Sequence, residues 1–236
     1  MSAGPSQQRA PSNASVVGAL LRAQLRLELR TFESVPAMWL FSVTAFVLFH
    51  FGLNVTQLSA NLASGVLWVT LLLAAMLVIN RLYLADAEQG GFDGFLLSPA
   101  DRGALLLAKV LTLLCYLAAV ELVAVPAFGL LLLQPSLGQT LPGLLGVLAL
   151  GDLGIAVIGA LVGALAIRTQ ARDLLGPMLS LPLLVPVMLC VAGATAPLFD
   201  PLRAGAIPLR LLVTLALYDA VFGLIAFALF DFLLED

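Results

Sequence analysis

Three carboxylic acids, Glu121, Asp152 and Asp219, lie inside long apolar stretches of the chain. Each stands roughly ten to thirteen residues from an end of its stretch, which at about 1.5 Å per helical residue places it some 15–20 Å deep. An ionised carboxylate costs at least about 2.5–3.5 kcal/mol at the centre of a bilayer. We therefore predict that these acids are protonated, face a wet cavity or meet another subunit. Neutral carboxyl groups hydrogen-bonded between helices and a functional site remain the two alternatives.

A second group of polar residues interrupts the apolar sequence between residues 81 and 109. Its charged members are Arg81, Asp86, Glu88, Asp93, Asp101, Arg102 and Lys109. Glycines, including Gly90, break the segment, and Ser98 with Pro99 offers a helix start because proline tolerates the first helical turn. We interpret 81–109 as a cytoplasmic connection between two membrane helices on which a soluble partner can act.

No motif of a soluble enzyme is present. The chain lacks G-x-x-x-x-G-K-[ST] and has a single lysine, so it has no phosphate-binding loop for ATP. Its single histidine, His50, excludes an H-E-x-x-H zinc site and a two-histidine haem site made within one chain. His50 is either a lone ligand or an interfacial side chain. We predict no catalytic residue, no metal site and no firmly bound cofactor.

Composition indicates the class of protein that holds these residues. The chain is 61% hydrophobic and 11% charged, with a mean hydropathy of +1.09, whereas soluble domains carry about 25% charged residues. A net charge of −3 gives no reason to expect nucleic-acid binding. Because a membrane-spanning helix needs about 20 apolar residues, we predict an all-α integral membrane protein with six transmembrane helices in one permease domain, 16–236. The expected spans are 37–53, 61–80, 110–133, 142–167, 174–192 and 211–234.

The N-terminal region is predicted to lie outside the bilayer core. Residues 1–15 have the composition of a disordered tail. Residues 16–33 are amphipathic, with Arg22, Arg26 and Arg30 in one row beside an apolar row. Such a helix lies in the headgroup plane, where its arginines reach lipid phosphates. The alternative is a solvated charged face with no membrane role.

Two further patterns concern the packing of the spans. Gly159 and Gly163 form a G-x-x-x-G pair, which lets helices approach closely. We favour packing within one subunit over dimerisation as its use. The segment 193–210 is rich in Ala, Gly and Pro, and a re-entrant segment or a broken pair of short helices is an alternative to a plain loop.

The basic residues predict the orientation. Nine fall on one side of the expected spans, and only Arg203 and Arg210 fall on the other. The positive-inside rule places the first set in the cytoplasm, so both termini are expected to be cytoplasmic.

Several short stretches of the chain resemble the CcmB family, the membrane subunits of an ABC complex in bacterial cytochrome c maturation. The resemblance rests on Arg81-Leu82-Tyr83, then Asp86, Glu88 and Gly90, then Phe95-Leu96-Leu97-Ser98-Pro99, Leu107-Ala108-Lys109 and Leu181-Pro182-Leu183-Leu184-Val185-Pro186-Val187. It covers about residues 18–232. Gly91 and the pair Phe92-Asp93 depart from the family's pattern, which affects where the coupling helix begins.

The resemblance implies an ABC-2 type exporter fold with an interfacial N-terminal helix and a cytoplasmic coupling helix between spans two and three. It assigns contact with the ATPase to Arg81, Asp86, Glu88, Gly90, Asp93, Ser98 and Pro99. The implied partners are the ATPase CcmA, the proteins CcmC and CcmD, the haem chaperone CcmE, and a second copy of the chain, in the bacterial inner membrane.

The implied function is haem export to the periplasm or ATP-driven release of the haem chaperone, with haem as a transported or handled ligand. A membrane scaffold without a transport path is an alternative of a different class. An ABC-2 exporter of another amphipathic substrate is a third possibility. A scaffold should work beside a catalytically dead ATPase, whereas a motor-coupled permease should not.

Overall fold

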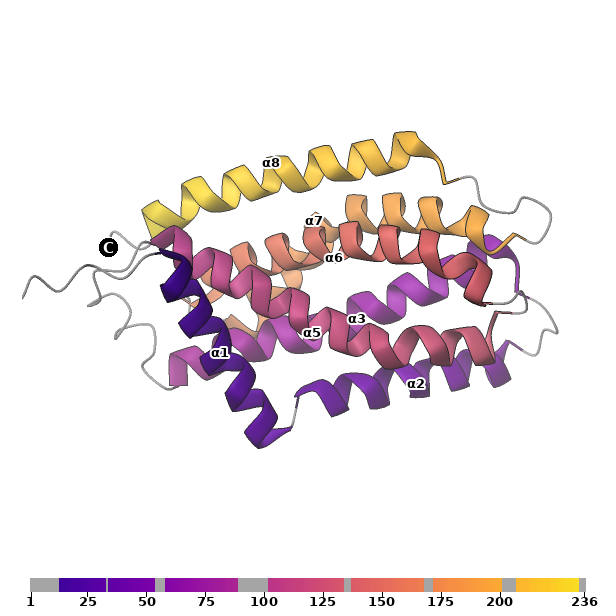
Figure 1. The fold of residues 1–236 in the computed structure, drawn as a ribbon, viewed down its shortest axis with the longest axis horizontal. Coiled ribbons are helices and arrows are strands. Elements are labelled where there is room, and N and C mark those ends of the chain that lie inside the picture. Colours follow the sequence, from indigo (N-terminus) through magenta and orange to yellow (C-terminus); the bar gives the residue numbers. More distant parts are fainter. Residues whose placement is uncertain are drawn as a thin grey trace, which may run out of the picture.

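A computed structural model shows a bundle of long helices (Figure 1). It describes residues 13–32, 34–53, 58–88, 102–133, 137–167, 172–200 and 207–233. The elements within these ranges are α1 (Asn13–Thr31), α2 (Ser34–Gly52), α3 (Ala60–Glu88), α5 (Arg102–Leu131), α6 (Leu137–Ile167), α7 (Arg172–Thr195), the short 3-10 helix η1 (Ala196–Leu198) and α8 (Leu209–Leu233). Six of the described helices are long and apolar enough to cross a membrane. The prediction of an all-α membrane protein with six spans is confirmed.

The helices extend further than hydropathy alone predicts. Helix α3 continues to Glu88 and α5 begins at Arg102, so only 89–101 of the expected connection 81–109 lies between helices. Helix α1 begins at Asn13, three residues before the expected start. The N-terminal tail is otherwise outside the described residues. Hydrophobicity marks the part of a helix inside the bilayer, and backbone hydrogen bonding carries the helix beyond it.

Helix α6 is the centre of the bundle and packs against α3, α5, α7 and α8. Glycines allow this close approach. A Cβ at Gly151 would stand 2.7 Å from the Trp68 ring, and one at Gly159 would stand 2.7 Å from the Cδ1 atom of Ile79. Gly159 therefore brings α6 against α3 of the same chain, as the preference for packing within one subunit predicted.

Side-chain hydrogen bonds join α3 to α7 inside the bundle. The indole N–H of Trp68 donates to the hydroxyl of Thr195 at 2.9 Å, and the hydroxyl of Ser64 donates to the carbonyl of Ala192 at 2.6 Å. Trp68, Ser64 and Thr195 are almost completely buried. These polar groups therefore find partners in neighbouring helices, as a low-dielectric interior requires.

Helices α2 and α8 lie on opposite sides of the bundle in Figure 1 and are the spans with the smallest buried share. Helix α7 contains Pro177, Pro182 and Pro186 and remains helical to Thr195. The described part of 193–210 holds the end of α7, η1 and the start of α8; residues 201–206, and with them part of the expected re-entrant segment, lie outside the described residues.

Candidate functional site: the junction of α1, α2 and α5

The end of α3, which contains Arg81, Asp86 and Glu88, lies at the same end of the bundle as the start of α5 and helix α1 (Figure 1). Arg81, Asp86 and Glu88 belong to the last turns of α3, although their side chains are outside the described part of the chain. Gly90, Asp93, Ser98 and Pro99 also lie outside the described residues. The structure therefore describes α3 and α5, the two helices on either side of residues 89–101. The contact of the predicted coupling residues with an ATPase stays a prediction.

Lys109 lies elsewhere than the sequence predicted. The sequence predicts it at the end of a polar connection, but it stands two turns inside α5 and is 3% exposed. Ala104 and Ala108 of α5 pack with Val17 of α1 in a small apolar cluster. The first two turns of α5 are therefore packed against α1.

Helix α1 packs against α5 and leaves part of its apolar row exposed. Val17 and Glu28 are buried, whereas Leu29 is 74% exposed. The three arginines of the predicted row, Arg22, Arg26 and Arg30, are exposed. Leu29 is therefore available to lipid, whereas Val17 and Glu28 contact the bundle.

The buried carboxylate of Glu28 connects three helices. Its Oε1 atom accepts hydrogen bonds from the backbone N–H groups of Ser34 at 2.7 Å and Val35 at 3.0 Å. Its Oε2 atom accepts one from the hydroxyl of Tyr116 in α5 at 3.2 Å. Ser34 and Val35 begin α2, and the first N–H groups of a helix have no partner within that helix. We call Glu28, Ser34, Val35 and Tyr116 the Glu28 clasp.

The clasp favours the ionised form of Glu28. Burial raises the pKa of this carboxyl group, but hydrogen bonds from the Val35 backbone, from the hydroxyl and backbone of Ser34, and from Tyr116 lower it by more, so the net pKa is below the ordinary 4.5. The positive end of the α2 dipole favours a negative charge at the same place. Glu28 is therefore a carboxylate at neutral pH.

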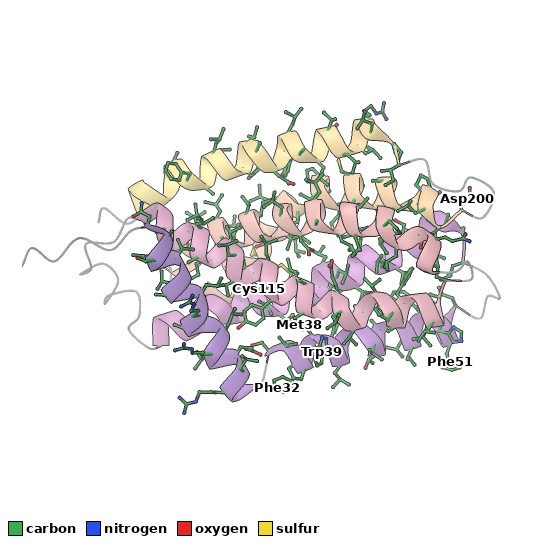
Figure 2. All side chains as sticks on the ribbon, viewed as in Figure 1. Phe32, Met38, Trp39, Phe51, Cys115 and Asp200 are labelled. Atoms are coloured by element: carbon green, nitrogen blue, oxygen red, sulfur yellow. The ribbon has the colours of Figure 1, made fainter. Side chains whose placement is uncertain are left out.

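The turn between α1 and α2 has an unusual backbone conformation. Phe32 has a φ of 46°, which a bulky side chain rarely adopts. Its N–H donates to the carbonyl of Glu28 at 2.6 Å, and its ring meets Trp39 edge-on at 6.3 Å. Trp39 in turn donates its indole N–H to the carbonyl of Ala119 in α5 at 2.8 Å. Figure 2 shows Phe32 and Trp39 at this turn.

Sequence reasoning missed Glu28, although a signal was present. Glu28 is the only acidic residue among the arginines of 16–30, and it comes six residues before the first residue of a span that has Pro36 in its first turn. A carboxylate near a helix start is a common capping group. The sequence did not reveal that Tyr116, 88 residues away, would share it.

The structure brings together two of the three intramembrane acids. A hydrogen bond joins the side chains of Glu121 in α5 and Asp152 in α6. Because an ionised carboxylate can only accept, one of the two groups must hold a proton. The bond joins two helices of one chain, as in the alternative of carboxyl groups hydrogen-bonded between helices.

Asp219 is separate from that pair. Its Oδ1 atom would lie 2.5 Å from a Cβ built on Gly154, beside Val187 of α7. Asp219 is 4% exposed, and neither of its oxygens has a hydrogen-bond partner in the described part of the molecule. No group of three His, Cys, Asp or Glu side chains within the described ranges is arranged to hold a metal ion.

The opposite end of the bundle carries His50 and an open apolar groove. The Nδ1 atom of His50 is 2.6 Å from the carbonyl of Leu131 and must donate to it, since a carbonyl only accepts. The groove, of about 380 Å³, is lined by Pro142, Gly143, Gly146, Val147, Ala149, Leu150, Ile207 and Leu212. Phe51 and Asp200 mark this end in Figure 2.

Comparisons with known proteins agree on one family. The profile described as CcmB protein matches residues 15–231. A heme exporter protein B of Pseudomonas aeruginosa is 32% identical over 181 residues, 76% of this chain and 80% of the relative. Proteins of the same name from Bradyrhizobium diazoefficiens and Rhodobacter capsulatus are 31% and 30% identical, over 89% and 86% of this chain and 94% and 89% of theirs.

Proposed function

The chain belongs to the CcmB protein family, and we propose that it is the permease subunit of an ABC transporter that handles haem in the maturation of c-type cytochromes. It acts in the bacterial inner membrane with haem as its cargo and has no ATP-binding motif of its own. A separate ATPase, corresponding to CcmA, drives it, and CcmC, CcmD, the chaperone CcmE and a second copy of this chain complete the assembly.

The family match over residues 15–231 carries this proposal. It covers all six candidate spans of the bundle, so it concerns the whole membrane domain. The named relatives are heme exporters, and the match extends through most of their own length. The alternative of an ABC-2 exporter for another amphipathic substrate has no comparable support.

In this proposal the ATPase acts on the end of α3 and the start of α5. Asp86 and Glu88 stand at the end of α3, and α5 resumes at Arg102. The excess of basic residues around this end of the bundle supports a cytoplasmic location. A short segment joined to two long helices can move them as levers when it docks on a partner.

Charge reversal tests this assignment. Replacing Asp86 and Glu88 together by Lys should leave ATP hydrolysis by the complex near the wild-type rate while c-type cytochrome assembly is lost. The control is D200K, because Asp200 lies at the opposite end of the bundle (Figure 2). Normal cytochrome assembly in the double variant would refute the lever assignment.

A catalytically dead ATPase distinguishes the permease from a scaffold. Export of haem and ATP-driven release of the haem chaperone both require hydrolysis, so assembly of cytochrome c should stop when the ATPase binds ATP without cleaving it. Assembly that continues beside the dead ATPase would support the scaffold.

The orientation is tested by labelling a cysteine introduced at position 93, in a background without Cys115 and Cys190. We expect this cysteine to be labelled from the cytoplasmic side only.

A further inference from the structure

We propose that Glu28 is a positioning residue of the coupling path, and that its carboxylate makes α2 follow the movement of α5. The inference rests on the proposed function, since it requires an ATPase that acts near the start of α5. It concerns a residue outside the predicted coupling segment. Glu28 does not touch haem or ATP in this assignment, and it acts through the helices that it joins.

The first step is the contact between α1 and α5. Val17 of α1 packs with Ala104 and Ala108 in the first two turns of α5, and Lys109 is buried there. Helix α5 begins at Arg102, directly after the segment where the ATPase is proposed to act. A displacement of the start of α5 therefore displaces α1 with it.

The second step is the connection from this unit to α2. One oxygen of Glu28 accepts from the first two N–H groups of α2, and the other accepts from Tyr116 in α5. Hydrogen bonds to an ionised carboxylate are the strong kind, and this carboxylate is buried. The clasp therefore resists separation of α2 from either neighbour.

The third step concerns the turn that the clasp closes. Phe32 holds a φ of 46° without being glycine. Such a conformation costs energy and persists only where the surrounding contacts impose it. The carbonyl of Glu28 and the ring of Trp39 supply those contacts on the two sides of the turn. The clasp holds Ser34 and Val35 directly after this turn, so its loss is expected to let the angle between α1 and α2 vary.

The fourth step is the freedom of α2 to move. Only 22% of the α2 span is buried in the bundle, compared with 61% of the α5 span. Its packing partners are α3 and α5. Helix α2 is therefore a peripheral span, and its displacement changes the packing of its own buried residues Met38 and Phe46 against α3 and α5.

The experiment uses the complete complex and separates the two halves of the clasp. E28A removes all the clasp hydrogen bonds, whereas Y116F removes only the bond to α5. Y218F is the matched control, because the hydroxyl of Tyr218 donates to the carbonyl of Leu183 at 2.7 Å in another part of the bundle. E28Q tests rescue by a side chain of the same shape that still offers an acceptor.

Two measurements are made on each variant. Cytochrome c assembly is compared with ATP hydrolysis, both per amount of folded complex. The distance between spin labels at R22C on α1 and L48C on α2, both exposed in the structure, is measured in a background without Cys115 and Cys190. The distance reports the angle at the turn and does not depend on the ATPase.

Coupling is expected to fall while hydrolysis continues. E28A should lower assembly per ATP hydrolysed about tenfold or more, because it removes every clasp bond, and Y116F about fivefold, because it removes one. E28Q should recover part of the loss, and Y218F should change nothing. The distance distribution should broaden in E28A and remain narrow in Y116F, because Y116F leaves the α1–α2 turn closed.

Two results would overturn the inference. Equal losses of assembly and hydrolysis in E28A, in proportion to the folded complex, would make Glu28 a stabilising residue only. Identical behaviour of Y116F and Y218F would show that the bond to α5 transmits nothing, and this result stands even if E28A does not fold. Wild-type assembly beside a dead ATPase would instead refute the proposed function, and the spin-label distances would still test whether Glu28 closes the turn.

Discussion

Glu28 and Asp219 are both buried carboxyl groups, yet their surroundings are opposite. Glu28 accepts hydrogen bonds from backbone N–H groups at the start of α2 and from Tyr116 of α5, whereas the oxygens of Asp219 have no partner among the described residues. The difference follows from the part of the neighbouring helix that each carboxyl group faces. The first N–H groups of a helix are free to donate, but in the middle of a span every N–H is already bonded within its helix.

Glu121 and Asp152 obtain a hydrogen-bond partner in a third way. Each lies in the middle of a span, and neither can obtain a backbone donor there, so each uses the other. A shared proton replaces the N–H groups that Glu28 finds at a helix end. The position of a carboxyl group along a helix therefore decides whether backbone N–H groups can stabilise its charge.

Loss of the Glu28 side chain should have the largest effect on stability. E28A leaves the N–H groups of Ser34 and Val35 and the hydroxyl of Tyr116 without their acceptor, so we expect a loss of about 3 kcal/mol. Thermal unfolding of the purified protein in detergent measures it, with E28Q as the smaller matched change. Equal stability of E28A and the wild type would contradict a stabilising role of the Glu28 hydrogen bonds.

A side chain at Gly154 should be the next most costly change. A Cβ there would stand 2.5 Å from the Oδ1 atom of Asp219 and 3.2 Å from a methyl group of Val187, whereas one at Gly146 would meet nothing within 4 Å. Relative to G146A, G154A should be less stable by about 2 kcal/mol. If the two alanine variants unfold at the same temperature, Asp219 does not lie against α6 as described.

Acid should weaken the clasp through Glu28. A carboxyl group whose pKa is lower in the folded than in the unfolded state stabilises the fold at pH values above the unfolded pKa, here about 4.5. That stabilisation disappears as the pH falls through the lower folded pKa. The unfolding temperature should therefore drop more between pH 6 and pH 3 in the wild type than in E28Q. Parallel curves for both proteins would contradict this assignment.

Asp152 should tolerate an amide with a small effect. D152N keeps a donor for Glu121 and removes the need for a shared proton, so the protein should still insert, and its stability should change by less than about 1 kcal/mol. The amount of folded protein recovered from membranes measures this. A severe loss of folded protein would reveal an ionic contact at Asp152 beyond the described residues.

Asp219 should be the least sensitive of these positions. With no partner among the described residues to lose, D219N should change stability by no more than about 0.5 kcal/mol. The same unfolding measurement applies, with D152N for comparison. A larger loss of stability in D219N than in E28Q would contradict this prediction and indicate that a partner subunit binds Asp219.

The amino-acid sequence by itself determined the membrane class, the six spans and the family. These depend on apolar runs and on short motifs, whose contributions add along the chain without regard to how helices are rotated. The same reasoning placed Lys109 in a polar connection, because hydropathy does not register a helix that continues past the bilayer. It also selected Glu121, Asp152 and Asp219, because a charge inside an apolar run is visible without a structure.

Only the tertiary structure decided which of these groups meet. Glu121 pairs with Asp152 and not with Asp219 because α5 and α6 present those faces to each other. Glu28 serves two helices because the turn at Phe32 brings the start of α2 back toward α5. Such contacts depend on the rotation and crossing of helices far apart in sequence, and no local pattern of residues encodes those quantities.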